Sequence, residues 1–144
     1  MKTSKIGHET SLIVPIYNGL SFTVKLLDSY REFHPGCKEL ILVNDGSIDG
    51  TPEFLKGLHS ADVQIITNEQ NMGYSASSNL GASLAKGESL CFLNNDLVLT
   101  EDWLDPMLEG MQALPRTGIV GCVQRNLGTG RVDNAGMYFD LDGF

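Results

Sequence analysis

Four short apolar segments constrain the fold of this chain most strongly, because none of them alternates between apolar and polar residues. A strand with one face in water alternates, whereas a strand of a parallel sheet is covered by helices on both faces and reads as a continuous apolar run. Amphipathic segments separate the four runs, so the pattern predicts an α/β fold with a mostly parallel sheet and helices on both faces. The predicted strands are Thr10–Ile16, Glu39–Val43, Val63–Thr67 and Leu90–Leu93.

Capping residues set the expected bounds of the helices. The first helix is predicted over 20–33, where apolar residues recur at helical spacing. Thr51 is expected to cap the second helix, and Gly87 to end the third. Thr100 is expected to cap a fourth helix, and a fifth strand is predicted over 118–123. The buried face of the third helix should carry its apolar residues, Ala76, Leu80 and Leu84.

Composition and charge exclude several classes of protein. The 144 residues are 42% apolar and 19% charged, which fits a folded globular domain. A net charge of −8 disfavours binding to nucleic acid, whose backbone repels an acidic surface. No apolar run approaches the roughly 20 residues that span a bilayer, and the first residues show no apolar signal core. Three scattered cysteines favour reduced thiols in a cytoplasmic protein.

A polar cluster follows each of the four predicted strands. The carboxyl ends of parallel strands meet at one edge of a sheet, and ligands of such sheets bind there. We therefore expect the four clusters to converge on one site. They contain Pro15, Tyr17 and Asn18 after the first strand, Asn44, Asp45, Gly46 and Ser47 after the second, Asn68 through Tyr74 after the third, and Asn94, Asn95 and Asp96 after the fourth.

The residue types in these clusters suit a nucleotide that is bound with a cation. Asp45 can accept a hydrogen bond from a base N–H, and the Tyr17 ring can flank the base. Asp96 can ligate a hard divalent cation that bridges two phosphates, while Asn94 and Asn95 offer neutral oxygens and donors to the sugar and phosphate. Neither a GxxxxGK[ST] loop nor a GxGxxG turn after the first strand occurs, so a P-loop enzyme and a Rossmann dehydrogenase are not expected.

Structural explanations compete with these assignments at single positions. Both Asn94-Asn95-Asp96 and Asp45-Gly46 are ordinary turn sequences. Tyr17 can pack at the edge of the domain, Gly73 can serve only a positive φ angle, and Asn79 can bond to neighbouring backbone of its helix. The occurrence of polar clusters after four successive strands favours one binding site over four independent turns.

Four stretches of the chain, in this order, resemble the successive motifs of family 2 glycosyltransferases of the GT-A fold. They are SLIVPIYNG, LILVNDGSIDGT, NEQNMGYSASSNLGASLAKGE and LCFLNNDLVLTEDWLDPML. The resemblance implies a Rossmann-like nucleotide-diphospho-sugar transferase fold. The LNND form of the last motif is similar to a subset that includes rhamnosyltransferases and other cell-surface polysaccharide transferases.

The resemblance also implies roles for single residues. Asp45 stands where the family recognises the base, and Asp96 would be the metal-binding residue of a DxD-type element, holding Mg²⁺ or Mn²⁺. Asn94 replaces the first carboxylate of that element, which argues against a metal–carboxylate bond at this position. The residues implied to bind the nucleotide sugar are Pro15, Tyr17, Asn18, Asp45, Gly46, Ser47, Asn71, Gly73, Asn79, Asn94, Asn95 and Asp96.

The implied activity is transfer of a sugar from a UDP-, dTDP- or GDP-sugar to a hydroxyl of a glycan or lipid-linked acceptor, with inversion and with a divalent cation. A lipid-linked acceptor would bring a cytoplasmic protein to the inner face of the membrane as a peripheral protein. Two alternatives stay open, a non-catalytic nucleotide-binding module on the same scaffold and a nucleotidyltransferase. The turn PIYNG, which lacks Lys and Arg, counts against a nucleotidyltransferase.

The resemblance predicts a division of the chain. Residues 1–9 are expected to form an N-terminal tail, and residues 10–144 a donor-binding portion from which most of the acceptor half is absent. The catalytic base of the family lies downstream of the DxD-type element. Asp133, Asp140 and Asp142 follow that element here, but no motif supports any of them, and the catalytic base stays unassigned.

Overall fold

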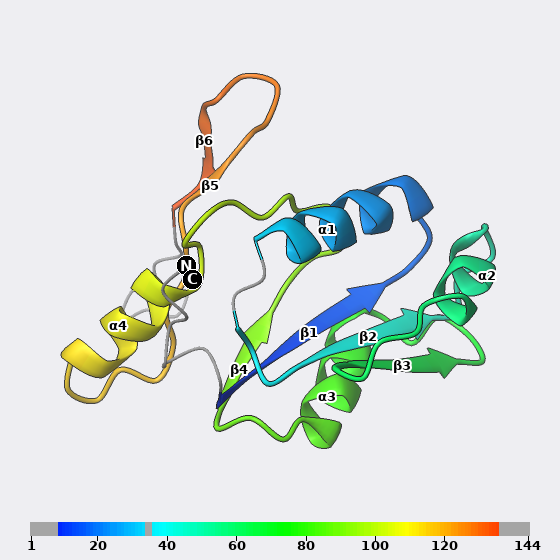
Figure 1. Cartoon of the computed structure of the whole chain (residues 1–144), viewed down its shortest axis with the longest axis horizontal. Coiled ribbons are helices and arrows are strands. Elements are labelled where there is room, and N and C mark those ends of the chain that lie inside the picture. Colours follow the sequence, from blue (N-terminus) through cyan, green and yellow to red (C-terminus); the bar gives the residue numbers. More distant parts are fainter. Residues whose placement is uncertain (1–8, 34–35, 136–144) are drawn as a thin grey trace, which may run out of the picture. The chain divides into compact units, whose positions relative to one another are not determined.

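The computed structural model describes residues 9–33 and 36–135, which divide into two compact units, Met1–Asp105 and Pro106–Phe144. The first unit alternates strands and helices (Figure 1). Its elements are β1 (Thr10–Ile16), α1 (Leu20–Glu32), β2 (Glu39–Asp45), α2 (Thr51–Lys56), β3 (Val63–Asn68), α3 (Tyr74–Leu84) and β4 (Ser89–Phe92). The predicted α/β fold is therefore confirmed, and the ends of the four apolar strands predicted in this unit lie within two residues of the observed ends.

The four strands form one parallel sheet in the order β3-β2-β1-β4. The chain moves in one direction from β1 to β3 and then returns past β1 to β4. With right-handed crossovers, this reversal puts α1 and α2 on one face of the sheet and α3 on the other. The change of direction falls between β1 and β4, where open α/β sheets commonly bind ligands.

Burial separates the two central strands from the two edge strands. All seven residues of β1 and all seven of β2 are buried, as the continuous apolar runs predict. In β4 the burial alternates, and the side chains of Leu90 and Phe92 are 44% and 46% exposed. Cys91 between them is only partly buried. Coverage on both faces therefore holds at the centre of the sheet and weakens toward its edges.

The α3 helix packs on the sheet through its smallest residues, so the prediction of its buried face was wrong. Ser77, Ser78 and Gly81 are buried, whereas Ala76 and Leu84 are exposed and Leu80 packs at the flank of the core. A Cβ atom at position 81 would lie 2.6 Å from Cγ2 of Ile13 in β1. The helix thus lies too close to the sheet for large side chains to fit between them.

Three predicted boundaries differ from the structure. Thr51 is the first helical residue of α2 rather than its cap, because the Asp49 carboxylate accepts the Thr51 N–H at 2.9 Å. The α3 helix ends at Leu84, and Gly87 instead passes so close to β1 that a Cβ there would lie 2.6 Å from the Ser11 nitrogen. The helix expected to begin at Thr100 begins only at Asp105, since Asp102 has a left-handed φ of 52° that interrupts a helix.

The second unit carries α4 (Asp105–Ala113), which begins on the last residue of the first unit, and a small antiparallel pair, β5 (Gln124–Arg125) and β6 (Val132–Asn134). Residues 118–123, all described, form no strand, and Ile119 is 92% exposed. The prediction of a fifth strand there was wrong, because an apolar run without a covering layer has nothing to bury it. Over the described residues, no helix is long and apolar enough to cross a membrane.

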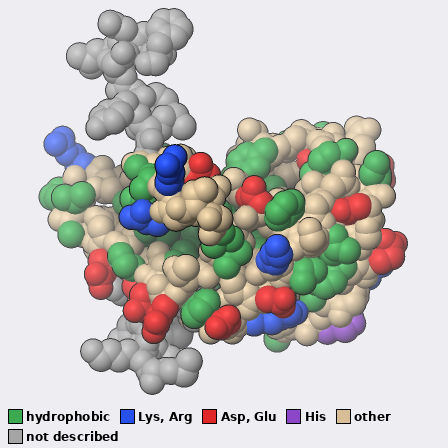
Figure 2. Space-filling view, turned by 90° about the horizontal axis from the view of Figure 1, so that it is seen from above, with side chains coloured by type: hydrophobic (Ala, Val, Ile, Leu, Met, Phe, Trp, Pro, Cys, Tyr) green, Lys and Arg blue, Asp and Glu red, His purple; other side chains and the backbone are tan. Residues whose placement is uncertain are grey.

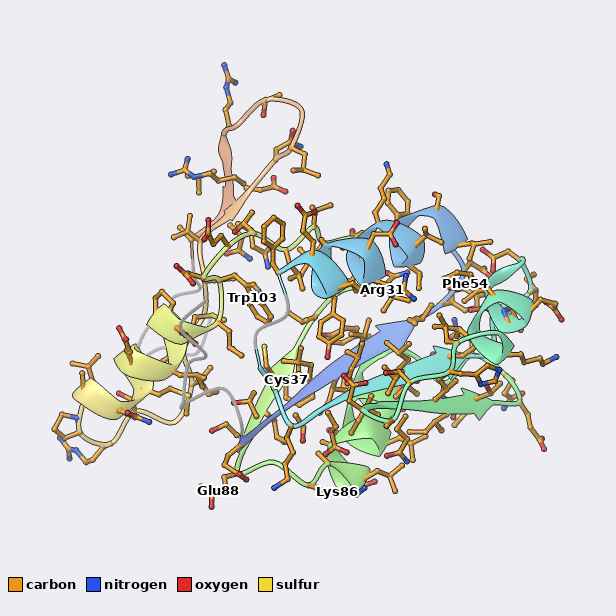
Figure 3. The ribbon with its side chains drawn as sticks, viewed as in Figure 1. Arg31, Cys37, Phe54, Lys86, Glu88 and Trp103 are labelled. Carbon is orange, nitrogen blue, oxygen red and sulfur yellow. The ribbon has the colours of Figure 1, made fainter. Side chains whose placement is uncertain are left out.

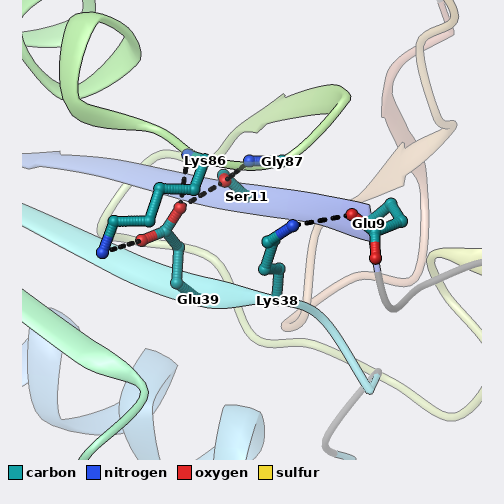
Figure 4. Close-up of polar contacts among 6 residues, drawn as sticks. All are labelled: Glu9, Ser11, Lys38, Glu39, Lys86 and Gly87. Atoms are coloured by element: carbon teal, nitrogen blue, oxygen red, sulfur yellow. Dashed lines mark hydrogen bonds and ion pairs between the residues drawn. The ribbon is translucent and has the colours of Figure 1, made fainter.

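A buried carboxylate holds the strands together at their amino ends. Glu39 is 7% exposed and accepts hydrogen bonds from the Ser11 Oγ at 2.7 Å and the Lys86 N–H at 2.6 Å. The Ser11 Oγ in turn accepts the Gly87 N–H at 2.9 Å (Figure 4). Lys86 and Glu88 lie on the connection from α3 to β4 (Figure 3). Glu39 therefore joins β1, β2 and the entry to β4 at the end opposite to the predicted site.

Candidate functional site

The loops that follow β1 and β2 are joined to each other by side-chain hydrogen bonds. The Asn18 N–H donates to the Ser47 Oγ at 2.8 Å, and the Ile48 N–H donates to the Asn18 Oδ1 at 2.8 Å. The Leu20 N–H donates to the Asp49 Oδ2 at 3.2 Å. Asn18 adopts a left-handed φ of 57°, which Asn tolerates better than most residues. Asn18 and Ser47, both predicted to contact a nucleotide, therefore also hold the two loops together.

Asp45, at the end of β2, organises the loop that follows β3. Its side chain accepts three hydrogen bonds, from the Asn68 Nδ2 at 2.8 Å, the Met72 N–H at 2.9 Å and the Gly73 N–H at 2.9 Å. Burial by itself would raise the pKa of the Asp45 carboxyl, but hydrogen bonds led by that from Asn68 outweigh burial and leave the pKa below its usual value. Asp45 is thus a buried carboxylate that stays ionised.

Two glycines of the predicted site have different physical requirements. Gly46 has a φ of 68°, and a Cβ there would lie 2.5 Å from the backbone carbon of Gln70. Gly73 has a φ of 88°, but a Cβ there would meet no atom within 4 Å. Gly46 therefore permits the close approach of the β2–α2 and β3–α3 loops, whereas Gly73 serves the backbone angle that directs its N–H to Asp45.

A pocket of about 250 Å³ opens at the carboxyl ends of the strands. In the sheet, β2 lies between β1 and β3. The pocket therefore combines Asp45, at the end of β2, with residues that follow β1 and residues that follow β3. Six residues of the predicted site line it, and six do not. The lining consists of Pro15, Ile16, Tyr17, Asp45, Asn71, Gly73, Tyr74 and Asn95. The six predicted residues outside the lining are Asn18, Gly46, Ser47, Asn79, Asn94 and Asp96.

Tyr74, the first residue of α3, belongs to the cluster expected at this edge, but sequence reasoning gave it no role in nucleotide binding. Its side chain is 54% exposed and lines the pocket together with that of Tyr17, which is 49% exposed. Tyr17 follows β1 and Tyr74 follows the loop after β3, and these two strands lie on either side of β2. An aromatic residue at the start of a helix does not by itself indicate a binding site. The signal that could have identified Tyr74 is its position directly after the predicted site residues Asn71 and Gly73.

The Asn94-Asn95-Asp96 turn follows β4 and is held against the β1–α1 turn by its middle residue. The Asn95 Nδ2 donates to the Asn18 carbonyl oxygen at 3.2 Å and to the Thr23 Oγ1 at 3.3 Å. Asn94 and Asp96 on either side are exposed. The four polar clusters therefore lie at one edge of the sheet, as the sequence predicts, and the Asp96 carboxylate faces solvent.

The donor set at this edge suits a cation that arrives with a ligand. Among the described residues, no group of three or more His, Cys, Asp or Glu side chains is placed to hold a metal ion. Mg²⁺ is commonly bound through one or two carboxylates together with substrate phosphates and water. A single exposed carboxylate at Asp96 fits that mode of binding and does not fit a cage made by the protein alone.

The remaining predicted residues lie elsewhere or outside the described part. Asn79 is exposed on α3, and Asp133 is exposed in β6 of the second unit. Asp140 and Asp142 lie outside the described residues. A second cavity of about 300 Å³ lies near the amino ends of the strands, and Leu27, Leu58 and Asp62 are among its lining residues. It is remote from the polar clusters, and burial raises the pKa of its Tyr30 phenol far above the usual value.

The parallel sheet, its reversal beside β1 and its polar strand ends define an α/β transferase fold of the GT-A type. A crystal structure of S. aureus TarS 1-349 has this fold, with a TM-score of 0.59 at 24% identity over 73% of this chain and 32% of that chain. The chain belongs to glycosyl transferase family 2, because the model of that family matches residues 11–137. The resemblance found in the sequence is thereby confirmed.

Two relatives illustrate the membership. The glycosyltransferase GlyG of Streptococcus pneumoniae serotype 4 is 27% identical over 113 residues, which are 77% of this chain and 38% of GlyG. The O-antigen biosynthesis protein RfbC of Myxococcus xanthus is 30% identical over 139 residues, which are 94% of this chain and 11% of RfbC. The chain thus spans less than half the length of either relative.

Proposed function

We propose that this chain binds the donor of a glycosyltransferase that moves a sugar from a nucleoside-diphosphate sugar to an acceptor hydroxyl in the synthesis of a glycan. The observation that carries the proposal is the pocket at the carboxyl ends of the strands, which Asp45, Tyr17 and Tyr74 line together. Membership of family 2 supports it, and the name of RfbC, an O-antigen biosynthesis protein, supports a glycan as the acceptor.

The pocket suits a nucleobase. Asp45 lines the pocket, and a carboxylate oxygen can accept a hydrogen bond from a base N–H. Uracil, thymine and guanine each carry such an N–H, which keeps UDP-, dTDP- and GDP-sugars as candidate donors. The rings of Tyr17 and Tyr74 offer π faces to either side of a planar base.

The exposed turn after β4 suits the diphosphate. Asp96 would hold Mg²⁺ or Mn²⁺, which supplies positive charge against the charge that develops on the leaving diphosphate. Asn94, exposed beside it, offers an amide to sugar or phosphate oxygens. Transfer with inversion also needs a base that takes the proton of the acceptor hydroxyl, and we assign none to this chain.

We propose, with this role, that residues 10–144 form one donor-binding portion that follows a short N-terminal tail. We place the protein in the cytoplasm, where nucleotide sugars are made, and a lipid-linked acceptor would add a peripheral contact with the inner face of the membrane. Asp and Glu side chains are spread over the face shown in Figure 2, in keeping with the net charge of −8 and with no role in nucleic-acid binding.

Calorimetric titration of the chain with UDP, dTDP and GDP, with and without Mn²⁺, tests the proposal. One of the three should bind, and Mn²⁺ should tighten its binding. Asp96→Ala should abolish the gain from Mn²⁺, whereas Asp28→Ala, at an exposed site on α1, should not change it. Absence of binding by the folded wild-type chain to all three nucleotides would refute the proposal. Donor binding without transfer by the longest available form would favour the non-catalytic module.

A further inference from the structure

Hydrogen bonds join the four polar clusters in the order in which the strands lie in the sheet. Asn95, after β4, bonds to the β1–α1 turn, and Asn18 in that turn bonds to the loop after β2. Asp45, at the end of β2, bonds to the loop after β3. Within the described part of the chain, the amide of Asn95 is the side chain that connects the turn after β4 to this network.

The orientation of the Asn95 amide follows from its partners. The Asn18 carbonyl oxygen can only accept a hydrogen bond, so the NH₂ group of Asn95 has to face it. The second N–H reaches the Thr23 Oγ1, which belongs to α1 and is fully buried. Both donors of the amide are therefore used within the protein, although the residue lines the pocket.

A second attachment holds the other end of the same segment. The Leu99 N–H donates to the Ser29 Oγ at 3.0 Å, and Ser29 is buried in α1, where its hydroxyl donates to the Leu26 carbonyl oxygen at 2.8 Å. The segment from Asn95 to Leu99 is thus fastened to α1 at both ends, at positions six residues apart on the helix. Asp96 follows the first attachment directly and projects into solvent.

We propose that Asn95 is a positioning residue, whose amide fastens the turn after β4 so that Asp96 is presented to the cation bound with the diphosphate. This inference rests on the proposed function. It assigns the three residues of the Asn94-Asn95-Asp96 turn to different tasks, because the outer two face solvent while the middle one faces the protein. The middle position requires a donor of two hydrogen bonds, which a carboxylate cannot be.

The proposal and the DxD-type motif predict opposite effects for Asn95→Asp. By motif, Asn95→Asp adds a carboxylate beside Asp96 and should strengthen the binding of a cation. By the contacts described above, the new carboxylate oxygen would face the Asn18 carbonyl oxygen, acceptor against acceptor. Asn95→Asp should therefore detach the turn and weaken the contribution of the cation to nucleotide binding.

The experiment compares Asn95→Ala, Asn95→Asp and Thr23→Val with the wild-type chain by titration with the best-binding nucleoside diphosphate, with and without Mn²⁺. Thr23→Val removes one acceptor of the amide inside α1, without touching the pocket. All three variants should reduce the gain in affinity from Mn²⁺ by about three- to tenfold, the effect of one or two lost hydrogen bonds. Thr23→Val, which lies outside the pocket lining, should change the metal-free affinity less than twofold.

Thr10→Val is the matched control. The Thr10 Oγ1 is buried in β1 and finds no hydrogen-bond partner among the described residues, so its loss should leave the gain from Mn²⁺ unchanged. Hydrogen exchange without nucleotide should show faster exchange over residues 95–99 in Asn95→Ala and Thr23→Val, but not in Thr10→Val. A structural defect elsewhere would lower thermal stability without this local change.

Three results would overturn the inference. They are an undiminished gain from Mn²⁺ in Asn95→Asp, an unchanged gain in Thr23→Val beside a lost gain in Asn95→Ala, and unchanged exchange over residues 95–99. The second result would mean that Asn95 acts by direct contact with the ligand. Failure of the wild-type chain to bind any nucleotide would instead overturn the proposed function and, with it, the purpose assigned to Asn95.

Discussion

Replacing Asp45 by Asn is expected to destabilise the first unit by about 2–3 kcal/mol, a magnitude that follows from its three hydrogen bonds. Two donors reach Oδ1 and one, the Gly73 N–H, reaches Oδ2. In Asp45→Asn the amide oxygen can keep the pair of donors, but its NH₂ group then faces the Gly73 N–H. One hydrogen bond to a charged acceptor is lost, worth about 1.5–3 kcal/mol, and two are weakened, while the lower cost of burying a neutral group offsets part of the loss.

Urea unfolding at neutral pH measures this loss as a fall in the free energy of unfolding at unchanged slope. Asp28→Asn, which breaks an exposed ion pair with Arg31, should cost less than about 1 kcal/mol and serves as the control. The reasoning fails if Asp45→Asn costs no more than that control.

The same residue makes stability depend on pH. Its folded pKa is lowered, so the stability that it contributes is present above the pKa of the unfolded chain and is lost as pH falls through the folded pKa. Urea unfolding across the acidic range should therefore show a shallower loss of stability in Asp45→Asn than in the wild-type chain. Parallel pH profiles would contradict the assignment of an ionised, hydrogen-bonded carboxylate.

Three further predictions concern packing, the amino ends of the strands and the pocket. Gly81→Ala should cost about 1–3 kcal/mol in urea unfolding, because its Cβ would lie 2.6 Å from Ile13, whereas Gly110→Ala, with open space in α4, should not destabilise the chain. Glu39→Ala should cost about 1–3 kcal/mol in the same assay by leaving buried donors unpaired, and a loss below about 0.5 kcal/mol would contradict this. Tyr74→Ala should weaken binding of the preferred nucleoside diphosphate in calorimetry by roughly tenfold, as for the loss of one base-stacking ring, and unchanged affinity would remove Tyr74 from the pocket.

The positions of the strands and of the polar clusters that follow them were predictable from local sequence. A continuous apolar run indicates a strand buried on both faces, and the polar residues that end each run mark the carboxyl ends where the site lies. The same rule failed for α3, because apolar periodicity selects the largest side chains as the buried face. Where a helix approaches a sheet closely, as at Gly81, the buried face instead carries the smallest.

The sequence predicted which residues lie near the site, but not what each of them does there. The carboxyl-end rule brings Asn18, Ser47 and Asn95 to one edge of the sheet without saying which atoms face a ligand. Their hydrogen bonds join residues from 29 to 77 positions apart in the chain, such as the Asn18 N–H with the Ser47 Oγ and the Asn95 Nδ2 with the Asn18 oxygen. Such pairings depend on the register of the sheet and the path of each loop, which single-sequence patterns do not contain.

The bonds between neighbouring strand ends have a consequence for engineering. A chimera that takes one loop from a relative to alter donor preference would also take side chains that form hydrogen bonds with neighbouring loops of that relative. The recipient lacks those neighbouring loops, so the imported side chains would lose their partners. Exchanging the segment around Asn18 without that around Ser47, for example, would remove the Asn18 Oδ1 and leave the Ile48 N–H to find a new acceptor. Grafts that carry adjacent loops together, chosen by strand neighbourhood rather than by sequence continuity, should keep the fold intact while the recognised base changes.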